Sequence, residues 1–374
     1  MRNLNIAFII FELGSGGQER QMSYAIKSLV DNGTKPILFV WDFRNKNIQD
    51  YGISDTGIEV IKLKGGFLSK IFYIRKKLIA DNINIFQSWS IVLNIILTLS
   101  TIGIKIECIG ALRGSLFGHY IKRANPFKNL KIFIQLLFVN NIVCNSLSAL
   151  NDLKKLFKNN PLIKKNFFIL RNRTKVNNDH MSIPSKCIYD SISCGSLLAV
   201  KNIDLIIDIV SVLKNNFPNY IHAHAGGNGN LHEELSKKIK SNKLEDNFLL
   251  LGELKSLDDF YCSGKIYIHS SNYEGTPNAL IEAMSFGLPI ISSDWGDADQ
   301  FVYNSENGII IDNKDFIVWA DYVMKILLDE QKIKKMGEAS FKIANQKLGL
   351  DNLYPDLIDI YSKVLSKKTN FIFS

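Results

Sequence analysis

The sequence predicts an α/β protein with two doubly wound domains that face one another across a cleft. The chain of 374 residues is longer than one ordinary domain, and hydrophobic residues make up 46% of it, enough for two cores. Short apolar runs of strand length alternate with helical periodicity in both halves. A polar and basic stretch at 163–185, which has a proline and no clear period, separates the halves and predicts an interdomain linker.

The first half opens with a strand–helix–strand unit. Ile6 to Phe11 is typical of a buried strand, and the glycine-rich turn at 14–17 leads into a helix that Asn32-Gly33 ends. Pro36 to Trp41 is the next expected strand, so the unit begins a parallel sheet. Further short strands are expected at 83–86, 104–111 and 141–145.

A second alternating series starts at Ser191. We expect strands at 220–225, 248–251, 266–270, 289–292 and 308–311, and helices at 203–213, 231–240 and 278–286, with more helices to about Ser366. The predicted domains are residues 1–177 and 186–350, followed by a C-terminal helix at 351–374 that could pack back on the N-terminal domain.

The net charge of +9 is unevenly divided. Residues 1–180 carry 26 Lys and Arg against 11 Asp and Glu, whereas residues 181–374 carry 19 against 25. The basic half favours an anionic partner, either nucleic acid or an anionic membrane surface, and a solvated Lys-rich surface is the simpler alternative. Basic and apolar residues are interleaved at 122–133, which suits a helix lying on a membrane or a buried helix with extended Lys stems.

Cysteine usage and hydropathy indicate the compartment. The chain has five cysteines and no Cys-x-x-Cys pair, which argues for a reducing compartment and against a zinc site. The N-terminal apolar run is too short for a signal peptide, and the stretch at 91–104 is too short and too polar to span a bilayer. We expect a cytoplasmic protein that could be peripheral at the inner face of the cytoplasmic membrane.

The most informative segment runs from Ser270 to Pro289. A strand ends at Ser270, a polar loop follows, and Pro277 stands where we expect the first helical residue. Amides in a first helical turn have no acceptor inside the helix and carry partial positive charge, so they bind phosphate oxygens. This corner therefore predicts a nucleotide diphosphate site.

Two glutamates flank the expected helix start. Glu282 lies at i+4 from Asn278, where its carboxylate can accept both hydroxyls of a ribose. Glu274 precedes the helix and could hydrogen-bond the hydroxyls of a sugar, while Gly275 allows a ligand close to the backbone. Taken alone, the two acids could equally be an exposed loop residue and a surface helix residue.

The spacing Glu274-x7-Glu282 within EGTPNALIEAMSFGLP resembles the signature of retaining GT-B glycosyltransferases of family 4, the glycosyl transferases group 1. Gly226-Gly227-Asn228-Gly229, Leu251-Gly252-Glu253 and Asn307-Gly308 resemble three further segments of that family, and Gly16-Gly17-Gln18-Glu19-Arg20 resembles its Gly-Gly-x-Glu-Arg loop. The resemblance covers nearly the whole chain and is strongest over 190–312. It implies two Rossmann-like domains, an acceptor-side one at 1–177 and a nucleotide-sugar donor domain at 186–350.

The resemblance also implies roles for residues. Glu274 and Lys201 are expected to act in catalysis by charge stabilisation and positioning. Donor contacts are expected from Gly195, Gly226, Gly227, Leu254, Gly275, Thr276, Asn278, Ala279, Leu280 and Glu282. Acceptor or phosphate contacts are expected from Gly16, Gly17, Arg113 and His119.

The implied reaction moves a hexose or N-acetylhexosamine from a nucleotide sugar, a UDP-sugar above others, to a saccharide or lipid-linked glycan with retention, in cell-surface polysaccharide biosynthesis. No cofactor and no metal are expected, because the nucleotide sugar is a co-substrate. The expected partners are donor, acceptor and an anionic membrane surface, and not nucleic acid.

The chain departs from the family pattern at one loop. Where the family commonly has Gly-Arg-Leu before a lysine, this chain has Gly195-Ser196-Leu197 and then Lys201. The lysine is kept and Ser196 replaces the arginine. The phosphate charge must then be met by Lys201, the helix amides and another arginine, for which the candidates are Arg113, Arg171 and Arg173.

Several alternatives stay open. A sugar-nucleotide epimerase could use the same architecture, and a nucleotide-sugar binder with impaired catalysis would account for Ser196. A nucleic-acid binder would explain the basic half but not the two glutamates. Asp297-Ala298-Asp299 could hold a metal, and His222 with His224 could be ligands, although a packed pair of strand residues is the favoured interpretation.

Overall fold

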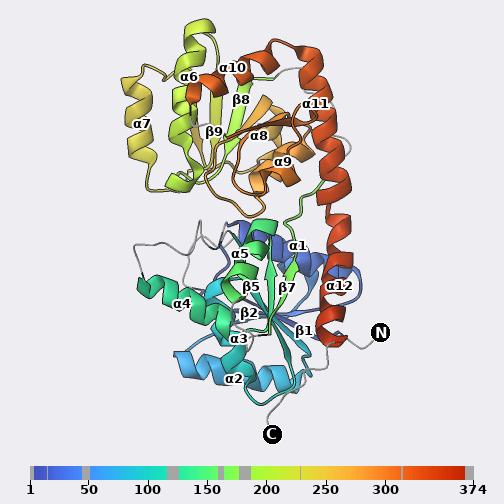
Figure 1. The fold of residues 1–374 in the computed structure, drawn as a ribbon. Coiled ribbons are helices and arrows are strands. Elements are labelled where there is room, and N and C mark those ends of the chain that lie inside the picture. The colour runs from blue at the N-terminus through green and yellow to red at the C-terminus, as the bar shows by residue number, and fades with distance from the viewer. Residues whose placement is uncertain are drawn as a thin grey trace. The chain divides into compact units, whose positions relative to one another are not determined.

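The chain folds into two compact units, each built on one parallel sheet (Figure 1). The structure is a computed structural model and describes residues 4–14, 16–43, 51–114, 116, 126–158, 164–176, 187–227, 229–312 and 315–366. Unit 1 comprises Met1–Arg173 with Leu350–Ser374, and unit 2 comprises Thr174–Gly349. The predicted fold class, α/β with two doubly wound sheets, is confirmed.

Unit 1 contains a seven-stranded parallel sheet in the order β3-β2-β1-β4-β5-β6-β7. Its strands are β1 (Ile6–Ile10), β2 (Ile37–Val40), β3 (Val60–Lys62), β4 (Ile85–Ser88), β5 (Glu107–Leu112), β6 (Asn141–Cys144) and β7 (Asn166–Ile169). All five residues of β1 are buried, as expected for a central strand covered on both faces.

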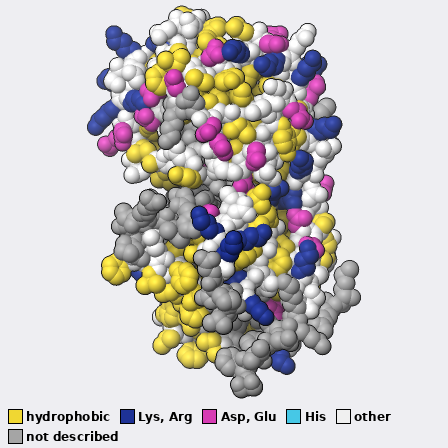
Figure 2. All heavy atoms as spheres, viewed as in Figure 1, with side chains coloured by type: hydrophobic (Ala, Val, Ile, Leu, Met, Phe, Trp, Pro, Cys, Tyr) yellow, Lys and Arg dark blue, Asp and Glu magenta, His cyan; other side chains and the backbone are white. Residues whose placement is uncertain are grey.

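Helices cover both faces of this sheet. They are α1 (Gly17–Asp31), α2 (Phe67–Ala80), α3 (Asn94–Thr101), α4 (Pro126–Leu137), α5 (Leu147–Phe157) and α12 (Leu353–Ser366), with 3-10 turns η1 (Ser54–Thr56), η2 (Ile91–Leu93) and η8 (Leu350–Asn352). Ile6 and Phe8 of β1 pack in the core shared with α1 and α12. Ala7 and Ile9 point to the opposite face, which packs against α2 and α3. Figure 2 shows that apolar side chains also gather on the surface over α4 and α2.

Helix α12 belongs to unit 1 although unit 2 precedes it in the sequence. Leu357 and Tyr361 of α12 are fully buried in the core with α1. The Tyr361 hydroxyl donates a hydrogen bond to Oε1 of Gln87 in β4, at 2.8 Å. The last helix is therefore an integral layer of the first unit.

Unit 2 contains a six-stranded parallel sheet in the order β10-β9-β8-β11-β12-β13. Its strands are β8 (Tyr189–Cys194), β9 (His222–Ala225), β10 (Phe248–Gly252), β11 (Gly264–His269), β12 (Ile290–Ser293) and β13 (Gly308–Ile311). Successive strands step outward from β8 to β10 on one side and from β11 to β13 on the other. The order thus reverses between β8 and β11, which is where open α/β sheets bind ligands.

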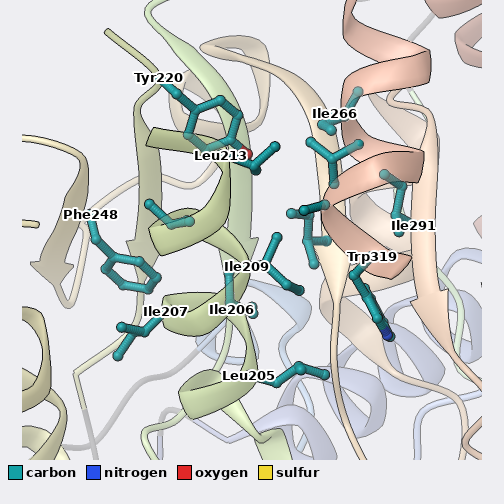
Figure 3. Packing of buried hydrophobic residues seen from close by; sticks show 14 of the residues in the cluster. Leu205, Ile206, Ile207, Ile209, Leu213, Tyr220, Phe248, Ile266, Ile291 and Trp319 are labelled. Atoms are coloured by element: carbon teal, nitrogen blue, oxygen red, sulfur yellow. The ribbon is translucent and has the colours of Figure 1, made fainter. Parts of the chain in front are cut away.

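Two apolar cores hold the helices of unit 2 on its sheet. The helices are α6 (Ile203–Asn216), α7 (His232–Ser241), α8 (Asp258–Cys262), α9 (Asn278–Ser285), α10 (Phe316–Leu327) and α11 (Glu330–Ile343), with short turns η5 (Ala199–Lys201), η6 (Ala298–Gln300) and η7 (Ala344–Leu348). One core joins α6 and α10 and includes Ile209 and Leu213 of α6 and Trp319 of α10 (Figure 3). The other joins α8 and α9 to the opposite face of the sheet.

Three expectations about local structure are wrong. The expected linker at 163–185 contains strand β7, whose residues pair with β6 as the edge of the first sheet. The short strand β3 was not expected, because its three residues carry too weak a pattern. Pro277 is the N-cap and not the first helical residue: its ψ of 117° is extended, and its carbonyl accepts the first helical hydrogen bond, from Ile281.

Within the described residues, every helix is too short or too polar to cross a lipid bilayer.

Removing part of the α12 anchor should destabilise unit 1. Leu357 is fully buried between α12 and the sheet. We expect Leu357→Ala to lower the free energy of unfolding of unit 1 by roughly 2–5 kcal/mol, because the substitution leaves a cavity. Urea unfolding of the full chain measures this loss. Lys363→Ala on the exposed side of the same helix is the control and should change stability by less than about 0.5 kcal/mol. Equal stability of the two variants would show that α12 is not part of the core.

Candidate functional site

The predicted donor residues gather at the carboxyl ends of the strands of unit 2. Lys201 follows β8 on the turn η5, and Glu274 follows β11 on the loop before α9. Because β8 and β11 are paired in the sheet, their carboxyl ends lie side by side. The chain leaves these two strands in opposite directions, so the loops open a space above the sheet.

Lys201 and Glu274 form an ion pair. Lys201 Nζ lies 2.5 Å from Oε1 of Glu274, and their side chains are 24% and 14% exposed. The two loops are also joined through the backbone of η5. Ser270 Oγ donates to the Lys201 carbonyl, and the Asn272 amide donates to the Val200 carbonyl, each at 2.8 Å. The position of the ion pair is thus fixed from both strands.

Glu274 is held in its charged form. Burial acts to raise the pKa of this carboxyl group. The positive charge of Lys201, together with hydrogen bonds from Lys201 and Ser271, outweighs burial and lowers the pKa below its ordinary value. The site therefore presents a carboxylate, which can accept hydrogen bonds from hydroxyl groups but cannot donate one.

His269, the last residue of β11, lies beneath this carboxylate as a neutral imidazole. Its Nε2 is 3.7 Å from Oε1 of Glu274, and its side chain is only 4% exposed. Burial lowers its pKa to about 4, and the pull of Glu274 does not reverse this. The ring stacks on Tyr267 and meets the edge of Trp295. Nothing in the sequence pattern singled out this residue.

The helix α9 begins beside the ion pair. Gly275, Thr276 and Pro277 are buried, and Asn278 and Ala279 are half-buried at the helix start. The Pro277 cap makes no side-chain hydrogen bond to the first turn, whose amides have no acceptor within the helix. Leu280 is fully buried in the core, so its side chain cannot contact a ligand and only its backbone could.

Glu282 lies one turn into α9 and is oriented by a tyrosine. The Tyr261 hydroxyl donates to Oε2 of Glu282 at 3.0 Å. Tyr261 itself is buried on α8 and stacks on Phe286. This contact fixes the rotation of the carboxylate, and no sequence pattern indicated the tyrosine's role.

The glycine loops after β8 and β9 approach one another closely. Gly226 has φ of +110°, and a Cβ there would lie 2.2 Å from the Gly195 carbonyl oxygen, so only glycine fits. The Gly226 amide donates to the Gly252 carbonyl at 2.7 Å, which ties in the end of β10. Gly227 packs against Gly252, and Leu254 joins the core below.

A buried chain of hydrogen bonds runs through β8 and β9 toward this loop. Tyr220 OH contacts Ser191 Oγ at 2.5 Å, and Ser191 Oγ contacts Nδ1 of His222 at 2.6 Å. Ser193 Oγ then bridges His222 Nε2 at 2.9 Å and His224 Nδ1 at 2.7 Å. Nε2 of His224 lies 3.0 Å from the Gly195 carbonyl oxygen, which ends the chain.

The carbonyl group at the end of this hydrogen-bond chain determines which group donates and which accepts at every step. A carbonyl oxygen only accepts, so His224 carries its proton on Nε2 and its Nδ1 accepts from Ser193. By the same logic His222 is protonated on Nε2 and accepts from Ser191. Burial lowers the pKa of both rings, which keeps them neutral. All four ring nitrogens are used in hydrogen bonds, which supports the packed pair over metal ligation.

The acidic pair near the end of the domain is split between two environments. Asp297, the N-cap of η6, is buried, whereas Asp299 within η6 is exposed. Over the described ranges, no three His, Cys, Asp and Glu side chains gather as metal ligands would.

The predicted sites in unit 1 are partly described. Gly16 caps α1 and Gly17 begins it, and the Glu19 carboxylate folds back over Gly16. Arg113 follows β5, lies over the Trp89 ring at 4.4 Å and donates to the Leu170 carbonyl at 3.3 Å. His119 lies outside the described residues.

Arg173, one of the candidates for binding phosphate, has partners within unit 1. Its side chain is 8% exposed, and its guanidinium forms an ion pair with Asp356 of α12. Gln21 of α1 hydrogen-bonds both the amide and the carbonyl of Arg173. The residue therefore fastens the end of the first segment of unit 1 to α1 and α12.

Solved glycosyltransferases have a similar fold. The crystal structure of HepE from Anabaena in complex with UDP-glucose matches with a TM-score of 0.80 at 13% sequence identity, over 96% of this chain and 100% of that one. The likeness shows the fold, which is the GT-B fold predicted from the sequence.

Relatives by sequence are also glycosyltransferases. The poly(ribitol-phosphate) alpha-N-acetylglucosaminyltransferase of Staphylococcus aureus is 24% identical over 224 residues, which cover 58% of this chain and 44% of the relative. A Campylobacter jejuni alpha-1,4-N-acetyl-D-galactosaminyltransferase, named for a diNAcBac-PP-undecaprenol substrate, is 24% identical over 348 residues, 89% of this chain and 91% of the relative.

The family described as glycosyl transferases group 1 matches residues 189–343, which lie within unit 2. The match covers less than half of the chain and shows that this part of unit 2 is similar to that family. The roles of the individual site residues stay predictions.

We expect unit 2 to lose stability as the pH falls from about 7 to 4. Burial lowers the pKa of His224 and of His269 to about 4, whereas an unfolded histidine has an ordinary pKa near 6.5. The unfolded chain therefore binds protons that the folded chain does not, so the free energy of unfolding falls below about pH 6.5 and goes on falling to about pH 4. Each histidine contributes a slope of up to roughly 1.4 kcal/mol per pH unit, measurable by urea unfolding at several pH values.

Replacing one histidine tests this account. His269→Leu should reduce the pH dependence of the free energy of unfolding between pH 4.5 and 6 by the contribution of one proton, which is roughly 1.4 kcal/mol per pH unit. The control is Tyr267→Phe, a substitution beside His269 that removes the hydrogen bond from Tyr267 to the Cys194 carbonyl. It should lower the free energy of unfolding without changing its dependence on pH. A slope that is the same in wild type and His269→Leu would contradict the neutral buried imidazole.

Proposed function

We propose that this chain transfers a hexose or N-acetylhexosamine from a UDP-sugar to a saccharide or lipid-linked glycan, with retention of the anomeric configuration. The Lys201–Glu274 pair beside the start of α9 carries this proposal, because it places a cation, a carboxylate and helix amides at one point of the sheet edge. The group 1 family match of the same residues supports it.

The diphosphate would lie at the start of α9. Its charge would meet the first-turn amides and the Lys201 ammonium group, since Ser196 supplies no charge where the family commonly has arginine. The Glu282 carboxylate, oriented by Tyr261, would accept the two ribose hydroxyls. UDP is favoured as the nucleotide because HepE, whose fold matches, is described in complex with UDP-glucose.

The sugar would lie against Glu274. As a carboxylate, Glu274 can accept hydrogen bonds from two sugar hydroxyls and place the anomeric carbon next to the phosphate. In the chain without ligand, Lys201 neutralises this carboxylate. When the donor binds, Lys201 can reach the phosphate while hydroxyl donors replace it at Glu274, so neither charge is left unpaired.

The transfer step needs no protein nucleophile and no metal. The bond between the anomeric carbon and the phosphate oxygen breaks, and the leaving diphosphate is stabilised by Lys201 and the amides. The acceptor hydroxyl forms its bond on the same face of the sugar, and its proton passes to the leaving phosphate. Glu274 and Lys201 therefore act through charge and position.

The setting is cell-surface polysaccharide biosynthesis. One relative is named for transfer to poly(ribitol-phosphate) and another for a substrate with a PP-undecaprenol group. An acceptor of the second kind is held in a lipid bilayer, which fits the excess of positive charge in residues 1–180. We propose that unit 1 receives the acceptor at the inner face of the cytoplasmic membrane.

Two rival functions differ in their products. A sugar-nucleotide epimerase would change the sugar of the donor without an acceptor. A binder with impaired catalysis, the alternative that Ser196 raises, would bind UDP-sugar and release neither UDP nor product. Product analysis with and without acceptor separates all three functions.

Substituting the two glutamates should separate catalysis from binding. Glu274→Gln should lower kcat roughly 100-fold with little change in the Kd for UDP, because it removes charge at the transferred sugar. Glu282→Ala should raise the Kd for UDP by about 10- to 100-fold, because it removes charged hydrogen bonds to the ribose. Steady-state kinetics and calorimetry give the two constants.

The matched control is Glu338→Gln, an exposed position on α11, which should keep both constants. Unchanged turnover in both site variants would remove the site assignment.

Nucleotide binding should raise the melting temperature of the chain. UDP and UDP-sugars bind the folded unit 2 and not the unfolded chain, so stability rises by mass action, by about 2.7 kcal/mol at 100 times the Kd. We expect a smaller or no shift with GDP and ADP, and a reduced UDP shift in Glu282→Ala. A thermal-shift series with the three nucleotides measures this, and a larger shift with GDP than with UDP would show that the base is misassigned.

A further inference from the structure

Most of the exposed large apolar side chains lie on one helical layer of unit 1. Among the described residues, 17 large hydrophobic side chains are exposed, and ten of them lie on or directly beside α2, η2, α3 and α4. We call this surface the α2–α4 face. The ten residues are Phe67, Leu68, Phe72, Tyr73, Ile79, Val92, Ile102, Phe127, Leu130 and Phe138.

These residues form the outer side of a layer whose inner side is already packed. On α2, Ile71, Ile74 and Leu78 are buried against the sheet, whereas Leu68 and Phe72 on its other side are each 67% exposed. Helix α3 touches both α2 and α4, so the three helices form one continuous surface. Figure 2 shows apolar side chains gathered over α4 and α2. The exposed apolar residues of this layer therefore do not contribute to the core, which the buried residues on the other side of the same helices already fill.

The charge on this layer has one sign. Helices α2, α3 and α4 and the turn η2 contain six Lys and Arg residues and no Asp or Glu. Lys76 on α2 and Lys131 on α4 are exposed. Lys77 is paired with Glu59 and Asp81, and Arg75 donates to the Ile102 carbonyl at the end of α3, at 2.5 Å. Lys76 is four residues after Phe72, and Lys131 is four residues after Phe127, so each lysine shares a helix face with exposed apolar residues. The surface therefore combines a large apolar area with positive charge.

We propose that the α2–α4 face binds the surface of an anionic lipid bilayer, with its aromatic and leucine side chains in the headgroup–acyl boundary and its lysines among the headgroups. A nucleic acid would contact basic groups but would leave Leu68, Phe72 and Phe127 in water, so it fits this surface poorly. A twofold dimer through the same face would bring together two copies of a surface whose helices carry only positive charge, and like charges oppose that contact.

The proposal corrects and extends the helix expected at 122–133. On α4, Phe127 and Leu130 are exposed, but Ile132 is buried in the core and Phe133 is half-buried. The apolar residues of α4 are thus divided between core and surface, and α2 supplies half of the α2–α4 face. Binding would bring unit 1 to the bilayer that holds a lipid-linked acceptor, and only this last link rests on the proposed transfer function.

Vesicle flotation of the full chain tests the proposal. We expect the chain to float with vesicles that contain about one third phosphatidylglycerol in phosphatidylcholine, and to bind pure phosphatidylcholine at least about tenfold more weakly. Raising the salt from about 0.05 to 0.5 M should weaken binding without abolishing it, because the apolar part is not screened. Equal binding to both kinds of vesicle, or none to either, would overturn the proposal.

Substitutions separate this surface from other exposed apolar sites. The double variant Leu68→Ser, Phe72→Ser should reduce binding to the anionic vesicles at least about tenfold, and Lys76→Glu with Lys131→Glu should do the same. The matched controls in unit 2 are Leu328→Ser, whose leucine is 72% exposed, and Lys335→Glu on α11, and both should bind as wild type does. Equal losses in the controls and the surface variants would contradict the assignment.

Two further measurements exclude rival occupants. Sedimentation of wild type and of the Leu68→Ser, Phe72→Ser variant should give the same mass without vesicles; a dimer that the variant loses would assign the face to a second copy. The UDP-induced thermal shift should be the same in wild type and variant, because these residues lie in unit 1. Vesicle binding without a UDP-induced thermal shift would contradict the transfer function and support the membrane surface. A UDP-induced thermal shift without vesicle binding would contradict the membrane surface and support the transfer function.

Discussion

The reversal of strand order between β8 and β11 is the constraint on which the candidate site depends. The chain leaves two paired strands in opposite directions, and the turn with Lys201 and the loop with Glu274 meet where no crossover helix can fill the space. The ion pair at 2.5 Å, two side chain and backbone hydrogen bonds, and the start of α9 all follow from that meeting. The attraction between the carboxylate and the ammonium group offsets part of the cost of burying each charge, and both can change partner when a phosphorylated sugar enters.

Polar groups in the interior of unit 2 connect the sheet to this site. The serine and histidine side chains of β8 and β9 form one continuous series of hydrogen bonds, which ends at the Gly195 carbonyl. Gly226 packs against that carbonyl. A fully satisfied buried network is rigid and specific, whereas one missing member would leave buried groups unpaired. Part of the geometry of the donor loops is therefore set from inside the sheet.

The sequence predicted the sheets and the donor corner because these depend on local patterns. Apolar runs, Asn32-Gly33 at a helix end, and the Glu274–Glu282 spacing can each be recognised within a few residues. What it did not show depends on distant partners. The contacts of Tyr261 with Glu282, of His269 with Glu274 and of Arg173 with Asp356 form only after folding. Strand β7 lies in a basic segment without a clear strand pattern, and it forms by pairing with β6. The paired role of His222 and His224 was favoured from their spacing, but the serines that complete the chain were not.

Because α12 completes the core of unit 1, synthesis on the ribosome has a fixed order of events. Residues 174–349 leave the exit tunnel before Leu353 to Val364 do, so unit 2 has all its residues while the sheet face that α1 covers still lacks its second helix, α12. Until α12 is available, Gln87 lacks its hydrogen bond from the Tyr361 hydroxyl, and Arg173 lacks its ion pair with Asp356. The nascent chain thus leaves part of an apolar sheet face uncovered until α12 emerges, and a chaperone that shields such faces would act on the unit that was made first.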